Sequence, residues 1–171
     1  MSTGTRIPLA EARVIAEDVI SRLGPHCSKL QVAGSIRRQR ATIGDIEIVC
    51  QPTAYDPSPL FLSGIATVVN QWEKIRGELP CKYTQRLLPC GLMLDLFMPD
   101  PAGFGLQLAI RTGSADWCKR VLAPAWIRAG YRSEDGLLRR ADGSIVPTPD
   151  EPGLFRLIGL EWVEPKHREV M

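Results

Sequence analysis

Apolar and polar positions along the first half of the chain predict a mixed sheet with helices beside it. Residues 9–23 carry apolar side chains at helical spacing and are followed by Gly24 and Pro25, which predicts a helix that ends there. A short apolar run over residues 30–33 predicts a strand. Over residues 44–50 acidic and apolar side chains alternate, so we expect a strand with one acidic face.

Three more elements are predicted before residue 100. Residues 57–72 hold a helix after a proline-rich turn. Residues 83–88 and 92–98 are predicted strands, and the short segment Pro89-Cys90-Gly91 joins them.

The pattern changes after Pro99-Asp100-Pro101. Residues 103–110 fit a helix and a strand equally well, whereas residues 116–129 predict a helix that Pro124 kinks or ends. The pair Asp142-Gly143, between two short apolar runs, indicates a two-residue hairpin, and a short helix is predicted over residues 150–158.

Length and composition are those of a globular protein with two small parts. The chain has 171 residues, of which 44% are hydrophobic and 23% charged. We expect an α+β fold with a boundary near residue 100, with a mixed sheet and flanking helices over residues 1–100 and a small α/β subdomain over residues 101–171. The longest uncharged stretch, residues 57–72, is too short and too polar to span a membrane.

Net charge says little about binding partners, whereas the cysteines indicate the redox compartment. The chain has 21 Lys and Arg against 19 Asp and Glu, and a net charge of +2 neither demands nor excludes a nucleic-acid partner. Five cysteines, an odd number without a Cys-x-x-Cys pair, favour reduced thiols in a cytoplasmic compartment over disulfides or a zinc site.

Three acidic residues are candidates for chemistry. Asp45 and Glu47 are two residues apart on a predicted strand, so their side chains share one face, with roughly 7 Å between the Cα atoms. Two such charges repel each other unless a cation lies between them, and oxygen ligands without His or Cys suit Mg²⁺ or Mn²⁺. Asp95 is alone in an apolar run. If its strand pairs beside the first, all three carboxylates meet at one edge of the sheet.

Gly34 and Ser35 add a candidate anion site. Gly34 permits a tight turn, and Ser35 can cap a short helix that begins at Ile36, so that helix N–H groups and Arg38 bind phosphate oxygens. Metal-binding acids beside a phosphate site are what phosphoryl transfer from a nucleoside triphosphate needs. Gly-Ser alone and Asp-x-Glu alone also occur on ordinary surface strands, and it is the joint pattern that favours a catalytic site.

These residues resemble the nucleotidyltransferase fold of the DNA polymerase beta superfamily, and in particular the family X DNA polymerases. Arg111-Thr112-Gly113-Ser114 resembles the family's Thr-Gly-Ser turn, which carries a cis peptide bond. Residues 139–147 resemble the small sheet of its nucleotide-selecting subdomain, and residues 157–168 resemble its closing Leu-Gly-Leu, Tyr/Trp, Pro-x-x-Arg motif. The resemblance covers residues 30–168.

The resemblance implies roles for the residues at matching positions. Asp45, Glu47 and Asp95 would hold two Mg²⁺ ions, or Mn²⁺, and Asp95 would be the base towards a primer 3′-hydroxyl. The nucleotide would be bound by Gly34, Ser35, Arg38, Gly44, Arg111, Thr112, Gly113, Ser114, Trp117 and Cys118. DNA would be held by Lys119, Arg120, Arg139 and Arg140.

The implied function is that of a minimal DNA-directed DNA polymerase, a palm plus the nucleotide-selecting subdomain. Such an enzyme adds dNMP from dNTP to a primer 3′-hydroxyl, here in short-gap DNA repair. Its partners would be dNTP and a primer-template or gapped DNA, and we expect a monomer without a membrane anchor. Since the sequence has no counterpart of the family's lyase domain or helix-hairpin-helix regions, we expect DNA binding to be weak and salt-sensitive.

Two other functions stay open. A nucleotidyltransferase that acts on an RNA end, a protein or a small molecule uses the same chemistry, although the C-terminal hairpin and tail favour a DNA polymerase. A catalytically inactive nucleic-acid-binding module would gain nothing from three clustered carboxylates. Two departures from the family bear on rate and sugar choice: Glu47 stands where Asp is usual, and Arg111 where an aromatic residue is common.

Overall fold

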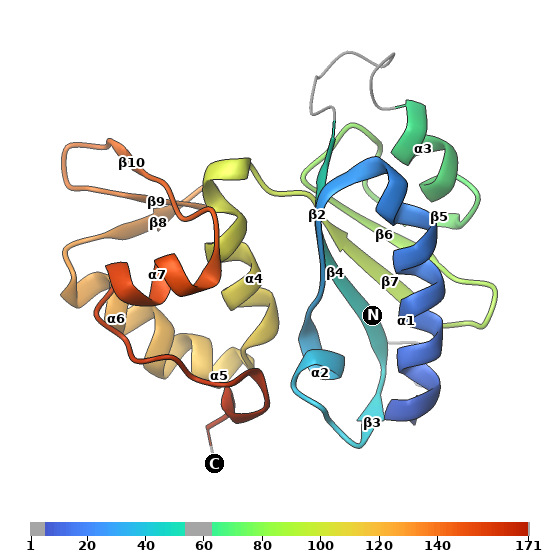
Figure 1. Cartoon of the computed structure of the whole chain (residues 1–171), viewed down its shortest axis with the longest axis horizontal. Coiled ribbons are helices and arrows are strands. Elements are labelled where there is room, and N and C mark those ends of the chain that lie inside the picture. The colour runs from blue at the N-terminus through green and yellow to red at the C-terminus, as the bar shows by residue number, and fades with distance from the viewer. Residues whose placement is uncertain (1–5, 54–62, 171) are drawn as a thin grey trace. The chain divides into compact units, whose positions relative to one another are not determined.

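The computed structural model describes residues 6–53 and 63–170, and the chain divides into two compact units, residues 1–98 and 99–171 (Figure 1). The elements of the first unit are β1 (Ile7–Pro8), α1 (Leu9–Leu23), β2 (Cys27–Val32), α2 (Gly34–Arg37), β3 (Thr42–Ile43), β4 (Asp45–Pro52), α3 (Ser63–Val69), β5 (Glu73–Arg76), β6 (Tyr83–Leu87) and β7 (Met93–Phe97). Those of the second are α4 (Phe104–Thr112), α5 (Ala115–Trp117), a π-helical turn (Cys118–Leu122), α6 (Ala123–Arg128), β8 (Arg132–Glu134), β9 (Leu137–Arg139), β10 (Ile145–Val146) and α7 (Glu151–Leu157).

The main sheet of the first unit has the order β2-β4-β7-β6-β5 among the described residues. The two central strands, β4 and β7, run parallel, and the other pairs are antiparallel. The parallel register sets Glu47 opposite Asp95. A mixed sheet with flanking helices was predicted, and the structure confirms it.

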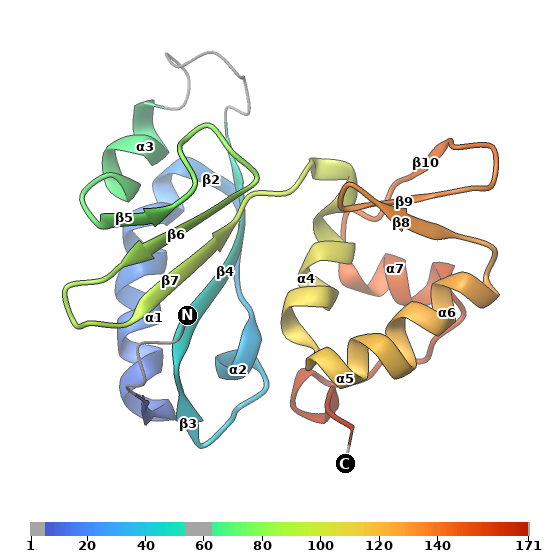
Figure 2. The same ribbon diagram turned by 180° about the vertical axis from the view of Figure 1, so that it is seen from behind.

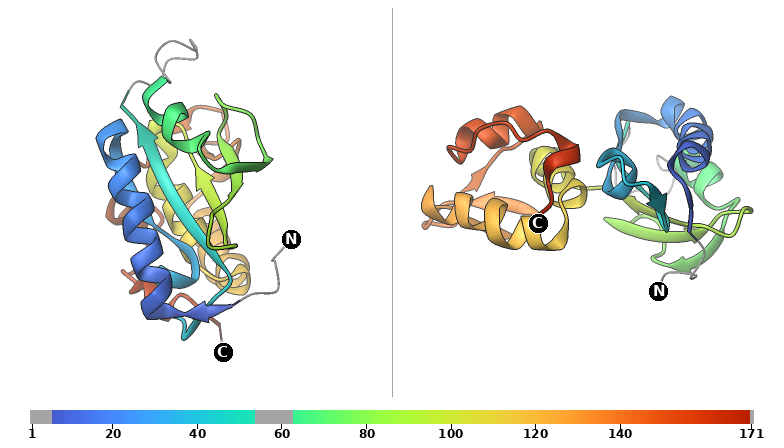
Figure 3. Two further views of the ribbon diagram at one scale, coloured as in Figure 1. Left: turned by 90° about the vertical axis from the view of Figure 1, so that its right-hand side faces the viewer. Right: turned by 90° about the horizontal axis from the view of Figure 1, so that it is seen from below.

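Helices α1 and α3 lie on one side of this sheet (Figures 2 and 3). The apolar stripe of α1 packs its buried side chains, Ala12, Ala16, Val19 and Leu23, into one hydrophobic core. Ile46 and Ile48 of β4 and Leu94 and Leu96 of β7 enter the same core. The prediction for residues 9–23 is confirmed, and so is the alternation of β4, in which Ile46, Ile48 and Cys50 enter the core that the helices share.

Some elements of the first unit escaped prediction. All four residues of β5 are exposed, so its sequence has no apolar period to find. The strands β1 and β3 are two residues long and pair only with each other among the described residues. In the segment 57–72, α3 is the predicted helix, and the turn expected over residues 57–62 lies outside the described residues.

The second unit packs helices against a small antiparallel sheet of order β10-β9-β8. The ambiguous segment 103–110 is helical in α4. Residues 116–128 are helical, one residue fewer than predicted, and Pro124 falls in the first turn of α6, where its missing N–H is tolerated. The π-helical turn before α6 takes up the change in hydrogen-bond pattern, so Pro124 does not end the helix.

The hairpin of the second unit is real but longer than expected. The N–H of Arg140 donates to the carbonyl of Ser144 (2.9 Å), which leaves three residues in the loop instead of two. Asp142 accepts from the N–H of Ser144 (2.9 Å), and Gly143 takes a φ of 87°. The predicted helix over 150–158 is α7, capped by Asp150. No helix among the described residues has the length and apolarity needed to cross a bilayer.

Candidate active site

Three half-buried carboxylates lie on the face of the main sheet that is turned away from α1 and α3. Asp45 begins β4, Glu47 follows two residues later, and Asp95 lies on the neighbouring strand, β7. Their neighbours along each strand, Ile46 and Leu94 among them, point into the core on the opposite face. The structure therefore brings the three predicted acids to adjacent strands of one face.

The charges of this face are unfavourable for Asp45. Burial raises the pKa of Asp45, and the nearby charge of Asp95 raises it further, while Arg6 and Arg38 lower it. The net direction is upward, so the two arginines do not compensate for burial and repulsion. A cation beside Asp45 and Asp95 would relieve both effects.

Glu47 extends towards the turn between β2 and α2. A Cβ atom placed on Gly34 would lie 1.8 Å from Oε2 of Glu47, so the carboxylate rests directly against this glycine. Gly34 has a φ of 59°, which a side chain would rarely adopt. The backbone ties the same two segments together, because the N–H of Ala33 donates to the carbonyl of Glu47 (2.8 Å). The extra methylene of Glu47 thus brings its carboxylate onto the Gly34 turn.

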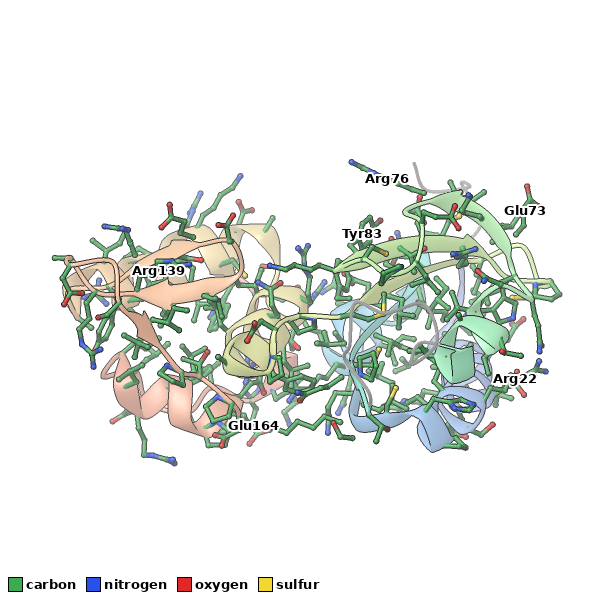
Figure 4. The ribbon with its side chains drawn as sticks, turned by 90° about the horizontal axis from the view of Figure 1, so that it is seen from above. Arg22, Glu73, Arg76, Tyr83, Arg139 and Glu164 are labelled. Carbon is green, nitrogen blue, oxygen red and sulfur yellow. The ribbon has the colours of Figure 1, made fainter. Side chains whose placement is uncertain are left out.

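Two residues that sequence reasoning missed hold Asp95. The hydroxyl of Tyr83 donates to Oδ1 of Asp95 (2.5 Å), and the amide Nε2 of Gln85 donates to the same oxygen (3.0 Å). Both come from β6, which pairs with β7 so that Gln85 stands opposite Asp95. Figure 4 shows Tyr83 on the side of the sheet away from α1. The period of two in the predicted strand puts Tyr83 and Gln85 on one face, but it does not identify Asp95 as their partner.

The donor set fits a hard divalent cation in its chemistry. It offers only carboxylate oxygens, the ligands that Mg²⁺ and Mn²⁺ prefer, and its charges repel each other. Within residues 6–53 and 63–170, however, no three His, Cys, Asp or Glu side chains are arranged as a ready metal site. The convergence predicted for Asp45, Glu47 and Asp95 is thus incomplete, because Glu47 extends to Gly34 and Asp95 is held by Tyr83 and Gln85.

The predicted phosphate turn has a different start from the one expected. Helix α2 begins at Gly34 instead of Ile36, and Ala33 precedes it without a side-chain cap. Ser35 lies inside the helix, where its hydroxyl cannot act as the cap, and its Oγ is buried without a hydrogen-bond partner. Gly44 is buried next to Asp45, and Arg38 is close enough to act on the charge of Asp45. The first unit therefore gathers Gly34, Ser35, Arg38 and Gly44 beside its acids.

The Thr-Gly-Ser turn of the second unit links α4 to α5. Thr112 is fully buried at the end of α4. Ser114 caps α5, because its Oγ accepts from the N–H of Trp117 (3.1 Å). The N–H of Ser114 donates to the carbonyl of Arg168 (3.0 Å), so the C-terminal tail supports the turn. Among the described residues the cis bond is Leu79-Pro80, and the bond between Gly113 and Ser114 is trans, contrary to expectation. In this form the N–H groups of both Gly113 and Ser114 donate hydrogen bonds, to the carbonyls of Ala109 and Arg168.

Trp117 and Cys118, which were predicted to contact the nucleotide, lie in and against the core of the second unit. Trp117 is 3% exposed and lies in the core of the second unit, stacked on Phe155 at 6.4 Å between ring centres. Sγ of Cys118 lies 3.4 Å from the carbonyl of Ile110, to which it donates. Stacking on Phe155 places Trp117 in the core, which its position in the sequence did not reveal, while Cys118 is half-buried.

The four predicted DNA contacts differ in how far they are engaged. Lys119 and Arg120 are exposed on the π-helical turn. Arg139, in contrast, donates through Nη1 to the carbonyl of Gly143 (3.0 Å), and its Nε lies 3.3 Å from Glu134. Arg140 is exposed beside Ser144. Arg139 therefore stabilises its own hairpin, while Lys119 and Arg120 extend into solvent.

The first unit has a mixed sheet with acids on one face, and the tail of the second unit carries the buried Arg168. Both features are consistent with a polymerase beta-like fold. A family model described as DNA polymerase beta thumb matches residues 107–169, most of the second unit. DNA polymerase lambda of Rattus norvegicus is 26% identical over 189 aligned positions, which cover 96% of this chain. The chain spans 33%, about a third, of that relative's length. These two similarities support a family X polymerase-like protein.

Proposed function

We propose that the protein is a DNA-directed DNA polymerase of a minimal family X type, which adds dNMP from dNTP to a primer 3′-hydroxyl in short-gap DNA repair. The observation that carries this proposal is the placement of Asp45, Glu47 and Asp95 on adjacent parallel strands of one open face. The family X likeness over 96% of the chain supports the choice of acceptor, since it extends through the second unit.

The chemistry would rest on the acids of the first unit. Asp45, Glu47 and Asp95 would hold two Mg²⁺ ions, with Mn²⁺ as a substitute. Ions bound there supply charge neutralisation for the leaving pyrophosphate and lower the pKa of the attacking hydroxyl. Asp95 would accept the proton of the primer 3′-hydroxyl. Because Tyr83 and Gln85 both bond to Oδ1, the other oxygen of Asp95 is the one available for this work.

Further residues would bind the nucleotide and the DNA. Oγ of Ser35, buried without a hydrogen-bond partner, Arg38 and the amide of Gly44 would bind the β- and γ-phosphates. The segment Arg111-Thr112-Gly113-Ser114 would lie along the sugar. Lys119 and Arg120 would bind DNA phosphates, so binding should weaken steeply with salt.

The five cysteines, all among the described residues, form no disulfide, and we propose a reducing, cytoplasmic setting for a monomer.

The test is extension of a 5′-labelled primer on one-nucleotide-gapped DNA, with Mg²⁺ or Mn²⁺ and each dNTP supplied singly. Extension should follow the template and disappear in Asp95→Asn. The matched control is Asp18→Asn, an acid on the exposed side of α1 that forms a surface ion pair with nearby Arg22.

Folded protein that extends no primer with either metal would overturn the proposal. Transfer of a nucleotide to an RNA end or to a protein, lost in Asp95→Asn, would instead establish the other nucleotidyltransferase reading. Binding of DNA with no transfer at all would leave an inactive binding module.

A further inference from the structure

We propose that Tyr83 and Gln85 are positioning residues that hold the carboxylate of Asp95 in the orientation that metal binding requires. The inference rests on the proposed function, which gives Asp95 its role. Its first ground is that both donors, the Tyr83 hydroxyl at 2.5 Å and the Gln85 amide at 3.0 Å, end on the same oxygen, Oδ1. Two donors on one oxygen fix the plane of the carboxylate and direct Oδ2 to a different partner.

The second ground is that both donors are themselves held. Strand β6 pairs with β7 in a register that sets Gln85 opposite Asp95 and Tyr83 opposite Phe97. The ring of Tyr83 stacks on Phe97 with 5.0 Å between ring centres and 24° between planes, and the guanidinium of Arg76 lies 6.0 Å from the Tyr83 ring. Ring stacking and strand pairing thus leave the Tyr83 hydroxyl little freedom to move.

The third ground is that Asp95 needs such support. The terminal torsion of an aspartate is soft, so an unheld carboxylate turns readily. Asp45 and Asp95 lie on neighbouring strands with their side chains on the same face, so the two carboxylates repel each other, which would turn Asp95 away in the absence of a cation. Tyr83 and Gln85 oppose that rotation before any ion arrives, which is the contribution expected of residues that orient a ligand.

The decisive variants remove the hydrogen bonds and keep the packing. Tyr83→Phe keeps the ring that stacks on Phe97 and loses the hydroxyl, and Gln85→Leu loses the amide donor at similar size. Tyr131→Phe is the matched control, because Tyr131 is a half-buried tyrosine of the second unit. Binding of Mn²⁺ to the full chain is measured by electron paramagnetic resonance, alongside the melting temperature and the steady-state kcat and KM for dNTP.

We expect Tyr83→Phe to bind Mn²⁺ about 10-fold more weakly, and the double variant up to about 100-fold, with an unchanged melting temperature. Their kcat should fall while KM for dNTP stays the same, since the nucleotide groups are untouched. Wild-type Mn²⁺ affinity and kcat in both variants would overturn the inference, and so would a wild-type chain that binds no Mn²⁺. Weaker Mn²⁺ binding in the variants of a chain that extends no primer would support the positioning role and overturn the polymerase.

Discussion

Arg168 offers the sharpest test of how the second unit is held together. It is 0% exposed, and its Nη1 lies 2.5 Å from Oε1 of Glu151, which is 3% exposed. Its Nε donates to the carbonyl of Val163 (2.8 Å). The guanidinium also lies 4.9 Å from the ring centres of both Phe155 and Trp162. We expect Arg168→Met to destabilise this unit strongly, because Glu151 would be left as a buried charge without its partner.

The magnitude follows from this burial. Removal of one partner from a buried ion pair costs about 3–5 kcal/mol, and lost cation–π contacts act in the same direction. For a unit of this size, 1 kcal/mol lowers the melting temperature by roughly 4–8 °C, so we expect a decrease of about 15 °C or more. Replacing both partners, as in Arg168→Met with Glu151→Leu, should recover most of that loss, since no buried charge then remains.

The assay is thermal unfolding followed by tryptophan fluorescence. Three of the four tryptophans, Trp117, Trp126 and Trp162, lie in the second unit, so the signal reports mainly on it. Lys166→Met is the matched control, because Lys166 is an exposed cation in the same tail and should leave the transition within about 2 °C of wild type. A loss below about 1 kcal/mol in Arg168→Met, or a double variant no more stable than the single one, would refute the reasoning.

Three further predictions concern the candidate site and the DNA contacts. Gly34→Ala should lower primer extension by about 10-fold or more, because a Cβ there meets Oε2 of Glu47 at 1.8 Å, whereas Gly91→Ala, also at positive φ but with open space around it, should keep wild-type activity. Asp45→Asn should raise the melting temperature in metal-free buffer at pH 7. Because the pKa of Asp45 is raised in the folded protein, ionisation of Asp45 destabilises the fold. This destabilisation is absent below the ordinary pKa of 3.8 and complete above the raised pKa. Equal melting temperatures of the variant and the wild type at pH 7 would contradict this prediction. Replacing Lys119 and Arg120 together with Ala should reduce the slope of log K against log salt for DNA binding by about 1.8, and Arg139→Ala should change it less, because Glu134 already holds Arg139.

The acidic face could be predicted because it depends on local periodicity. In β4 the period of two sends Asp45 and Glu47 to one side and Ile46 and Ile48 to the other, whatever the strand pairs with. Asp95 stood out for the same reason, as a lone acid in an apolar strand. The helix over residues 9–23 followed from its apolar stripe and the Gly-Pro stop.

What could not be predicted depends on partners far away in the sequence. Tyr83 reaches Asp95 across a strand pair whose register no local pattern encodes. Trp117 was expected near a nucleotide, but packing with Phe155, nearly forty residues later, places it in the core. The hairpin at Asp142-Gly143 was recognised by its turn residues, while its loop length is set by the bond between Arg140 and Ser144.

The two faces of the main sheet contribute in opposite directions to stability. The helix-side face stabilises the first unit, and the face with the candidate site destabilises it. The helix-side face carries the large apolar core of the first unit, so its packing can offset the cost of acids on the other face. That cost is visible at Asp45, whose pKa is raised despite the opposing charges of Arg6 and Arg38. If Asp45 and Asp95 were ordinary surface residues, the side chain of Asp95 could turn away from Asp45, and the repulsion between the two carboxylates would decrease. Instead two donors on β6 hold Asp95 in place, so the repulsion between Asp45 and Asp95 persists, as the proposed cation site would require.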